Sequence, residues 1–380
     1  MPPASARLQS IDALRGLVML FMLLDHVRET FFLHRQVGDP MEAANVAPEL
    51  FFTRLLSALC APVFIFLTGL SAWLYSQKHS RADTSRFLLK RGLFLVLLEL
   101  TLVNLAWNGT LLAQTLWLQV IWCIGLCMIV LAAALHLPRG LLLGLGALIV
   151  GGHNLLDPLV LGPGSPWFTP WAILHQRDFI ELGEVTRART TYPVLPWIGV
   201  ILLGWGVGPW FAQGVPARRR VRRLLGWGGG LLLAFVGLRY LNGYGEQPWV
   251  AMGDALRTTM SFLSARKYPP SLLFLLPTLG LGLVLLAVLE RQQARRWVPV
   301  LALFGAAPMF FYLLHLYVLK ALYLAAVAVW GLNQGQYFGF EGVGGVWLCS
   351  LALALLLYVP TRWFAALKQR RRDIAWLKYF

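Results

Sequence analysis

Residues Arg15 to His26 read RGLVMLFMLLDH, an apolar run that carries an arginine at one end and an aspartate and a histidine at the other. A charged side chain inside hydrocarbon costs about 2.5 to 3.5 kcal/mol on insertion scales. We therefore expect the two polar ends to share an environment that offsets this cost, such as the interior of a helix bundle or a wet cavity. The run predicts a membrane-spanning helix with a functional face.

The composition is that of a membrane protein. Of the 380 residues, 58% are hydrophobic and only 13% are charged, whereas soluble domains carry about 25% charged residues. The net charge of +16 would suggest nucleic-acid binding in a soluble protein, but here membrane topology explains it and no nucleic-acid partner is expected. The four cysteines lie in apolar runs without ligand spacing, so we expect neither a disulfide framework nor a metal site.

Apolar segments of spanning length predict an all-α, polytopic fold. A spanning helix needs about 20 mostly apolar residues, and the chain offers about ten such segments. We expect a single transmembrane domain over residues 1–380, with a basic cytoplasmic tail at 367–380. The expected spans are 11–30, 55–76, 89–107, 113–136, 139–156, 193–213, 224–241, 271–289, 307–331 and 344–366.

Basic residues are concentrated in alternate loops, as the positive-inside rule requires of cytoplasmic loops. With the N-terminus inside, the inside segments hold most of the lysines and arginines, including the run PARRRVRR and the terminal residues Arg7 and Arg372. Both termini are therefore expected in the cytoplasm. Long loops usually carry function, and the long outside loops lie near 27–54, 157–192 and 242–270.

Polar residues follow one face of the first expected helix. Arg15 and His26 are eleven residues apart, which is three turns plus about 20° and about 16 Å along the axis. Asp12, Met19 and Met22 complete a stripe with spacings of three and four residues. Such a stripe should face the bundle interior or a wet cavity. In the alternative, Arg15 snorkels to the headgroups, Asp12 caps the helix and His26 is satisfied at the other interface.

The far end of this stripe is a charged cluster. Asp25 and Arg28 are three residues apart on the helix and can form an ion pair. A neutral imidazole accepts a proton near pH 7 or attacks an acyl group, so His26 is the first candidate for catalysis. His34, expected just past the helix end, is a second candidate base, with an ordinary surface histidine as the alternative.

Further polar residues interrupt the expected spans. Glu99 must pair or take up a proton, and we expect it to accompany an arginine in a structural or cavity-lining role. Gln119 and His315 lie on apolar helices, where hydrogen bonding between helices is the usual role. Lys267 and Tyr268, in the outside stretch SARKYPPSLLF, either hold an anionic ligand or anchor the interface. The candidate substrate contacts are thus Asp12, Arg28, Glu99, Gln119, Lys267, Tyr268 and His315.

Several stretches resemble a known family. RLQSIDALRGLVMLFMLLDHVRETFFLH, APVFIFLTGLSAWLY, YPVLPWIGVILLGWGVG and KYPPSLLFLLPTLG are similar to bacterial membrane proteins grouped with the catalytic domain of heparan-alpha-glucosaminide N-acetyltransferase. The resemblance runs from about residue 7 to 320. The Arg, ten residues, His spacing also resembles that of integral-membrane O-acetyltransferases of bacterial surface polysaccharides, whose Arg and His correspond here to Arg15 and His26.

The resemblance implies a multi-pass acyltransferase of the bacterial inner membrane. Acetyl-CoA would be a donor substrate from the cytosol rather than a tightly bound cofactor, and the acceptor would be the hydroxyl or amine of a glycan or lipid-linked sugar on the periplasmic side. In the lysosomal enzyme the active histidine follows the first helix, and its nearest position here is His34. We rank His26 first, in a site with Arg15 and Asp25, because it shares a face with Arg15.

Two other functions stay open on the sequence. A proton-coupled transporter or a flippase of a lipid-linked sugar would use the same stripe as a path, with His26 and Glu99 as a proton relay. A membrane scaffold would use the bundle without catalysis.

Overall fold

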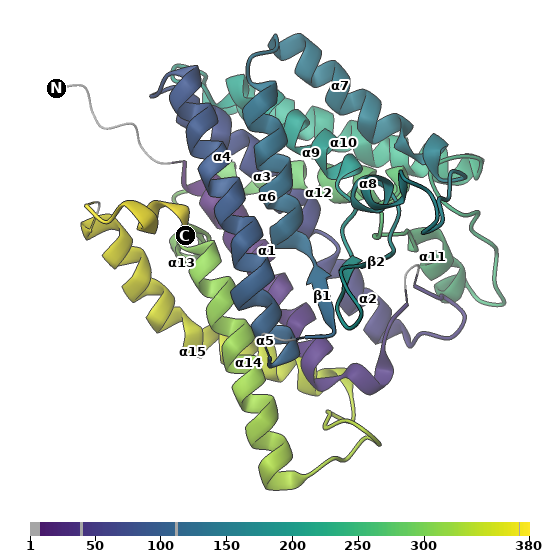
Figure 1. The fold of residues 1–380 in the computed structure, drawn as a ribbon. Coiled ribbons are helices and arrows are strands. Elements are labelled where there is room, and N and C mark those ends of the chain that lie inside the picture. The colour runs from purple at the N-terminus through teal and green to yellow at the C-terminus, as the bar shows by residue number, and fades with distance from the viewer. Residues whose placement is uncertain (1–7, 39–40, 111–112, 372) are drawn as a thin grey trace.

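Helices dominate the computed structural model, which describes residues 8–38, 41–110, 113–371 and 373–380 (Figure 1). Arg7 and Arg372, which entered the topology argument, lie outside the described residues. Helix α1 (Gln9–Phe31) is buried over most of its length. It packs against α3 (Cys60–Ser76), α12 (Leu272–Arg291), α13 (Trp297–Ala306), α14 (Pro308–Trp330) and α15 (Val343–Arg370). Three of its charged residues, Asp12, Asp25 and Arg28, are therefore buried in protein.

Six helical segments of the described chain are long and apolar enough to cross a membrane. Three shorter apolar helices accompany them, and α1 itself carries five charged residues within its 23. The count of about ten spans and the cytoplasmic termini stay predictions. The six segments are α2 with α3 (Pro48–Ser76), α7 with η3 (Arg139–Leu156), α10 (Ala217–Leu241), α12, α14 and α15.

The other elements connect and cover these helices. The helix α4 (Arg81–Leu98) continues through the π-helical turn η2 (Glu99–Val103) into α5 (Asn104–Asn108). Gly109, at φ 76°, ends it in the left-handed conformation that terminates many helices. The remaining elements are η1 (Leu33–Arg35), α2 (Pro48–Ser57), α6 (Val120–Ala134), α7 (Arg139–Gly152), η3 (His153–Leu156), α8 (Phe168–Leu174), α9 (Leu195–Gly206), η4 (Gly208–Phe211), α11 (Ala255–Leu263) and η5 (Ala375–Tyr379).

The expected span at 113–136 is wrong in its first part. The strand β1 (Thr115–Leu118) comes first, and α6 begins only at Val120. The Asn104 side chain accepts a hydrogen bond from Trp117 N at 2.7 Å and donates one to Trp117 O at 3.1 Å. A side chain thus replaces the backbone partner that a helix would supply, and the segment stays extended.

Glu99 lies at the start of α6 and not beside an arginine. Its Oε2 accepts hydrogen bonds from Ile121 N and Trp122 N, both at 3.0 Å. These amides belong to the first turn of α6, where helix N–H groups have no partner of their own. Glu99 therefore caps a helix that begins inside the bundle, which corrects the expected arginine pairing.

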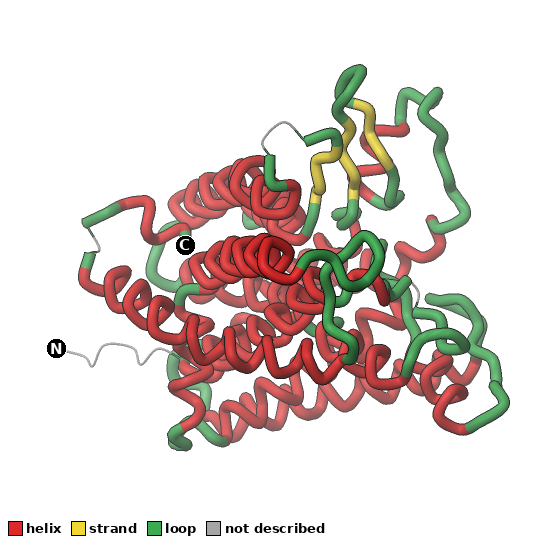
Figure 2. The backbone as a smooth tube through the Cα atoms, turned by 90° about the horizontal axis from the view of Figure 1, so that it is seen from below, coloured by secondary structure: helices red, strands yellow, loops and turns green. Residues whose placement is uncertain are grey.

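A small sheet lies at one edge of the bundle (Figure 2). Its strands β2 (Phe179–Glu181) and β3 (Arg187–Thr190) come from the long loop after α7 and pair in the order β1-β3-β2. β1 is parallel to β3, with Thr115 opposite Arg187, and β2 is antiparallel to β3. The all-α prediction is right for the bundle and omits this sheet, because strands of three or four residues are too short to show a period of two.

Candidate active site

One cavity of about 370 Å³ follows α1 through the bundle. All five residues of the expected stripe line it, namely Asp12, Arg15, Met19, Met22 and His26. Side chains of α3, α4, α6 and α14 form much of the remaining wall, and residues of α15 and of the loops before α9 and α12 also contribute to it. The polar face of α1 thus faces a cavity and not lipid.

Arg15 is held firmly at one end of this cavity. Its Nη1 donates to Asp12 Oδ1 at 2.9 Å and to Gly305 O at 3.1 Å, and its Nη2 donates to Ser71 Oγ at 2.9 Å. These bonds come from α1, α13 and α3, so three helices fix the guanidinium. The side chain is directed into the bundle rather than snorkelling to the membrane surface.

Two further cationic side chains line the same end. Arg91 comes from α4 and Lys368 from α15. Among the described residues, the buried Nε of Arg91 has no hydrogen-bond partner. Lys368 Nζ donates to Phe380 O, whereas Arg15 and Arg91 line this end with guanidinium groups, which suit an anionic ligand.

His26 lies toward the other end and is hydrogen-bonded to a second histidine. His26 Nδ1 is 2.7 Å from His315 Nε2, and His315 Nδ1 is 2.7 Å from Phe311 O. A carbonyl only accepts, so His315 Nδ1 carries the proton of its neutral ring and His315 Nε2 is an acceptor. His26 Nδ1 must then donate, which leaves the lone pair of the neutral His26 ring on Nε2.

The tautomer makes His26 ready to act as a base or a nucleophile. The ring packs edge-on against Trp107 and Tyr312, with centroid distances of 5.3 and 5.9 Å. It is 8% exposed and lines the cavity. Orientation by a second group, burial and access to a cavity are the features of a catalytic histidine.

Asp25 is fixed by two arginines. Its Oδ1 accepts from Arg28 Nε at 3.0 Å, as the spacing predicts, and its Oδ2 accepts from Arg54 Nη1 at 2.5 Å. Two guanidinium groups stabilise the ionised carboxylate. Asp25 also lines the cavity, where it supplies a fixed negative charge near His26.

Lys267 and Tyr268 reach the cavity beside Tyr192. The Lys267 Nζ lies 5.1 Å from the centroid of the Tyr268 ring and 5.9 Å from that of Tyr192. The two tyrosine hydroxyls are 3.4 Å apart. Because all three residues line the cavity, this group offers an ammonium, two hydroxyls and two aromatic faces to a ligand.

A comparison with protein families identifies the chain. The family model of the catalytic domain of heparan-alpha-glucosaminide N-acetyltransferase matches residues 7–245. The chain belongs to this family. No curated protein matches the sequence.

Membership in this family indicates a membrane acyltransferase-like protein. Such an enzyme needs a donor and an acceptor substrate. The matched residues include all of α1 and its polar face. Lys267, Tyr268 and His315 follow the matched region, so their place in the site rests on the structure.

The structure separates the candidate residues into two groups. Gln119 lines the cavity with the residues described above, although it precedes α6 instead of lying on an apolar helix. Four candidates lie outside the cavity lining: Arg28, His34, Glu99 and His315. Of these, Arg28 supports Asp25 and His315 supports His26.

His34 lies on η1, away from the cavity wall. Its ring packs against Phe32 at a centroid distance of 4.9 Å. Partial burial and the neighbouring Arg35 lower the pKa of His34. The histidine nearest to the family's active position is thus a half-buried side chain, whereas His26 faces the cavity.

Several lining residues were missed by the sequence analysis. Glu29 continues the stripe, since it is three residues after His26, and the same spacing would have found it. Arg91 lies at the start of the expected span 89–107, where a basic residue indicates topology and not a cavity. Tyr192 and Tyr312 come from distant segments, and no local spacing relates them to α1.

Proposed function

We propose that the protein transfers an acetyl group from cytosolic acetyl-CoA to a hydroxyl or amine of a glycan or lipid-linked sugar on the periplasmic side of a bacterial inner membrane. The observation that carries this proposal is the single cavity that Arg15 and His26 both line. The two residues are about 16 Å apart along the axis of α1. A member of an acyltransferase family therefore has a cationic group and a candidate base in one continuous space.

The cationic end suits the phosphates of the donor. Guanidinium groups bind phosphate oxygens in a planar fork, and both Arg15 and Arg91 line this end. The pantetheine arm would extend past Met19 and Met22, whose flexible side chains accommodate an irregular chain. The thioester would then lie near His26.

His26 supplies the proton transfer. Its Nε2 takes the proton of the acceptor hydroxyl or amine while the acceptor oxygen or nitrogen forms a bond to the thioester carbonyl carbon. The carbon–sulfur bond breaks and the proton leaves with the CoA thiolate. Alternatively, Nε2 itself forms a bond to the carbonyl carbon as the carbon–sulfur bond breaks and CoA leaves as the thiolate. In a second step the acceptor oxygen or nitrogen takes the acetyl group from Nε2, and the acceptor proton is released to neutralise the thiolate.

The direct test is transfer of radiolabelled acetyl from acetyl-CoA in membranes, with glucosamine added as an amine acceptor beside the endogenous glycans and lipid-linked sugars. His26→Ala is expected to lower transfer by about 10²-fold or more, since general bases contribute that much. His34→Ala is the matched control and should stay close to wild type. A folded His26→Ala protein with wild-type transfer would remove the assignment, and sugar uptake into proteoliposomes without acetyl-CoA consumption would make the protein a transporter.

Donor binding is tested separately by thermal stabilisation of the detergent-solubilised protein. Acetyl-CoA should raise the melting temperature and acetate should not. Arg91→Gln is expected to raise the acetyl-CoA concentration needed for half of this effect about tenfold, because a hydrogen bond to a charged group contributes about 1.5 to 3 kcal/mol. Arg86→Gln, on the same helix with a side chain 76% exposed, should have no effect. Equal stabilisation of both variants would place the donor elsewhere.

A further inference from the structure

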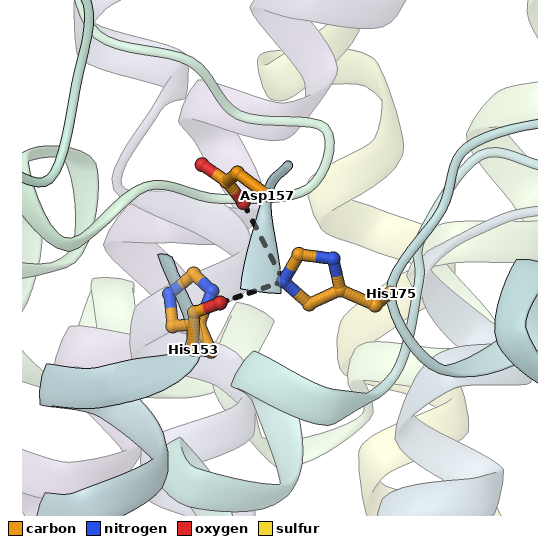
Figure 3. Close-up of side chains that lie close together, drawn as sticks. All are labelled: His153, Asp157 and His175. Atoms are coloured by element: carbon orange, nitrogen blue, oxygen red, sulfur yellow. Dashed lines mark hydrogen bonds and ion pairs between the residues drawn. The ribbon is translucent and has the colours of Figure 1, made fainter. Parts of the chain in front are cut away.

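Two histidines and an aspartate that do not line the cavity lie close together (Figure 3). His153 and Asp157 lie at the end of the α7–η3 segment, and His175 follows α8. One ligand atom of each residue lies within 4.8 Å of the others. His175 Nε2 is 3.5 Å from Asp157 Oδ1 and 3.0 Å from His153 O.

Three buried atoms in this cluster have no hydrogen-bond partner among the described residues. His153 is 2% exposed, yet among the described residues neither of its ring nitrogens has a hydrogen-bond partner. The buried Oδ1 of Asp157 has none either. Leaving a polar atom buried and unpaired costs about 1 to 3 kcal/mol, and such atoms indicate a missing ligand.

The rest of the Asp157 carboxylate is already engaged. Its Oδ2 accepts from Asn154 Nδ2 at 3.0 Å and from the Arg266 guanidinium. These bonds fix the carboxylate and leave Oδ1 for the cluster. Hydrogen bonds of this kind orient the ligands of metal ions in proteins.

The geometry points to a binding site for a zinc-type divalent transition-metal ion, held by His153, Asp157 and His175. Zinc lies about 2.0 to 2.2 Å from imidazole nitrogen and carboxylate oxygen, so tetrahedral ligands are about 3.3 Å apart. The 3.5 Å between His175 Nε2 and Asp157 Oδ1 is close to this separation. Imidazole nitrogens favour zinc over magnesium or calcium, and solvent would complete the coordination.

Metal binding would replace one hydrogen bond. His175 Nε2 donates to His153 O, and this nitrogen must give up its proton to serve as a ligand. The ring then carries its proton on Nδ1. His153 needs no such exchange, because its ring nitrogens have no partners to lose.

The site would connect the α7 end to the outer part of the cavity. Asp157 binds Arg266, which directly precedes the cavity-lining residues Lys267 and Tyr268. Asn154 Oδ1 accepts from Leu272 N, at the start of α12, at 2.8 Å. The ion would thus stabilise the loop that presents Lys267, without contact with the reacting groups.

The test uses the full chain, purified in detergent without a polyhistidine tag and stripped with EDTA. After addition of Zn²⁺ and desalting, elemental analysis should find about one zinc per chain, and Zn²⁺ but not Mg²⁺ should raise the melting temperature. His153→Gln and His175→Gln should lose both effects, whereas His136→Gln, an exposed histidine, should keep them.

A Co²⁺ titration gives a readout that does not depend on stability. The wild type and His136→Gln should develop the visible absorption of four-coordinate Co²⁺, and His153→Gln should not. The proposal is overturned if the wild type retains no zinc, if Mg²⁺ stabilises it equally, or if the His153→Gln spectrum is that of the wild type. None of these outcomes depends on acetyl transfer.

Discussion

The proton on the His26 ring is placed by a carbonyl on another helix. Phe311 O fixes His315, and His315 fixes His26 through bonds of 2.7 Å each. The same logic orients the histidine of hydrolase triads, where an aspartate is the outer partner. Here the outer partner is neutral, so it sets the tautomer without stabilising an imidazolium as a carboxylate would.

Two substitutions of His315 distinguish its role in orienting the His26 ring from its role in filling space. His315→Leu is expected to lower kcat about 10²-fold, the lower range of general-base catalysis, with little change in KM, because nothing would hold the His26 tautomer. His315→Gln retains an acceptor oxygen for His26 Nδ1 and should restore much of kcat. The measurement is kcat and KM over a range of pH. Equal activity of the two variants would show that His315 only fills space.

At this scale, local spacing predicted the cavity-facing stripe of α1 because all its members lie on one helix. The pairing of His26 with His315 joins residues 289 positions apart, and no spacing within a helix encodes it. The sequence identifies both histidines as polar residues on apolar helices. It does not predict the hydrogen bond between them.

Helices α1 and α13 approach each other closely at two glycines, Gly16 and Gly305. A Cβ atom on Gly16 would lie 1.8 Å from Leu301 O, and one on Gly305 would lie 1.9 Å from Asp12 O. Small residues let membrane helices approach in this way. The contact also places Gly305 O within reach of Arg15.

Gly16→Ala should therefore force the two helices apart. Overpacking of this kind costs about 1 to 3 kcal/mol, so we expect a lower melting temperature in detergent and weaker stabilisation by acetyl-CoA. Gly144→Ala is the matched control on α7, because a Cβ there would meet nothing within 4 Å. If both substitutions left the melting temperature unchanged, the close approach of α1 and α13 would be wrong.

The start of α6 is a boundary that hydropathy alone does not predict. The apolar run at 113–136 has spanning length, and hydropathy alone extends a helix through it. Two polar side chains on the preceding helix segment, Glu99 and Asn104, bind its backbone and keep β1 extended. These are tertiary contacts, and they overrule the local pattern.

For the whole molecule, composition was enough to predict a helical membrane protein, and motifs were enough to predict its family. The small sheet was not predictable, because its strands are short and β1 pairs with a distant strand, Thr115 with Arg187 of β3. The cavity was predictable only as the environment that the stripe of α1 requires. Its basic lining residues could be identified only from the structure, since Arg91 and Lys368 are far apart in the sequence.

The orientation in the membrane is tested with single introduced cysteines. Glu184→Cys and Arg218→Cys lie at exposed positions on opposite expected sides. A membrane-impermeant maleimide should label Glu184→Cys in intact spheroplasts and Arg218→Cys only after lysis, because the basic run at 218–223 should be cytoplasmic. The parent protein is the control, because Cys60, Cys123 and Cys127 are buried but Cys349 is partly exposed and sets the background labelling. The reverse labelling would invert the topology.

The cavity along α1 also determines which part of the proposed reaction responds to the membrane voltage. Moving one elementary charge across a potential of 100 mV involves about 2.3 kcal/mol. An acetyl group is neutral, so its passage from the Arg15 end to His26 requires no electrical work, and the charged phosphates of the donor stay where they bind. The proton accepted by His26 is charged. An energised membrane would therefore act on the transfer of that proton from His26 to the CoA thiolate, but not on the passage of the acyl group.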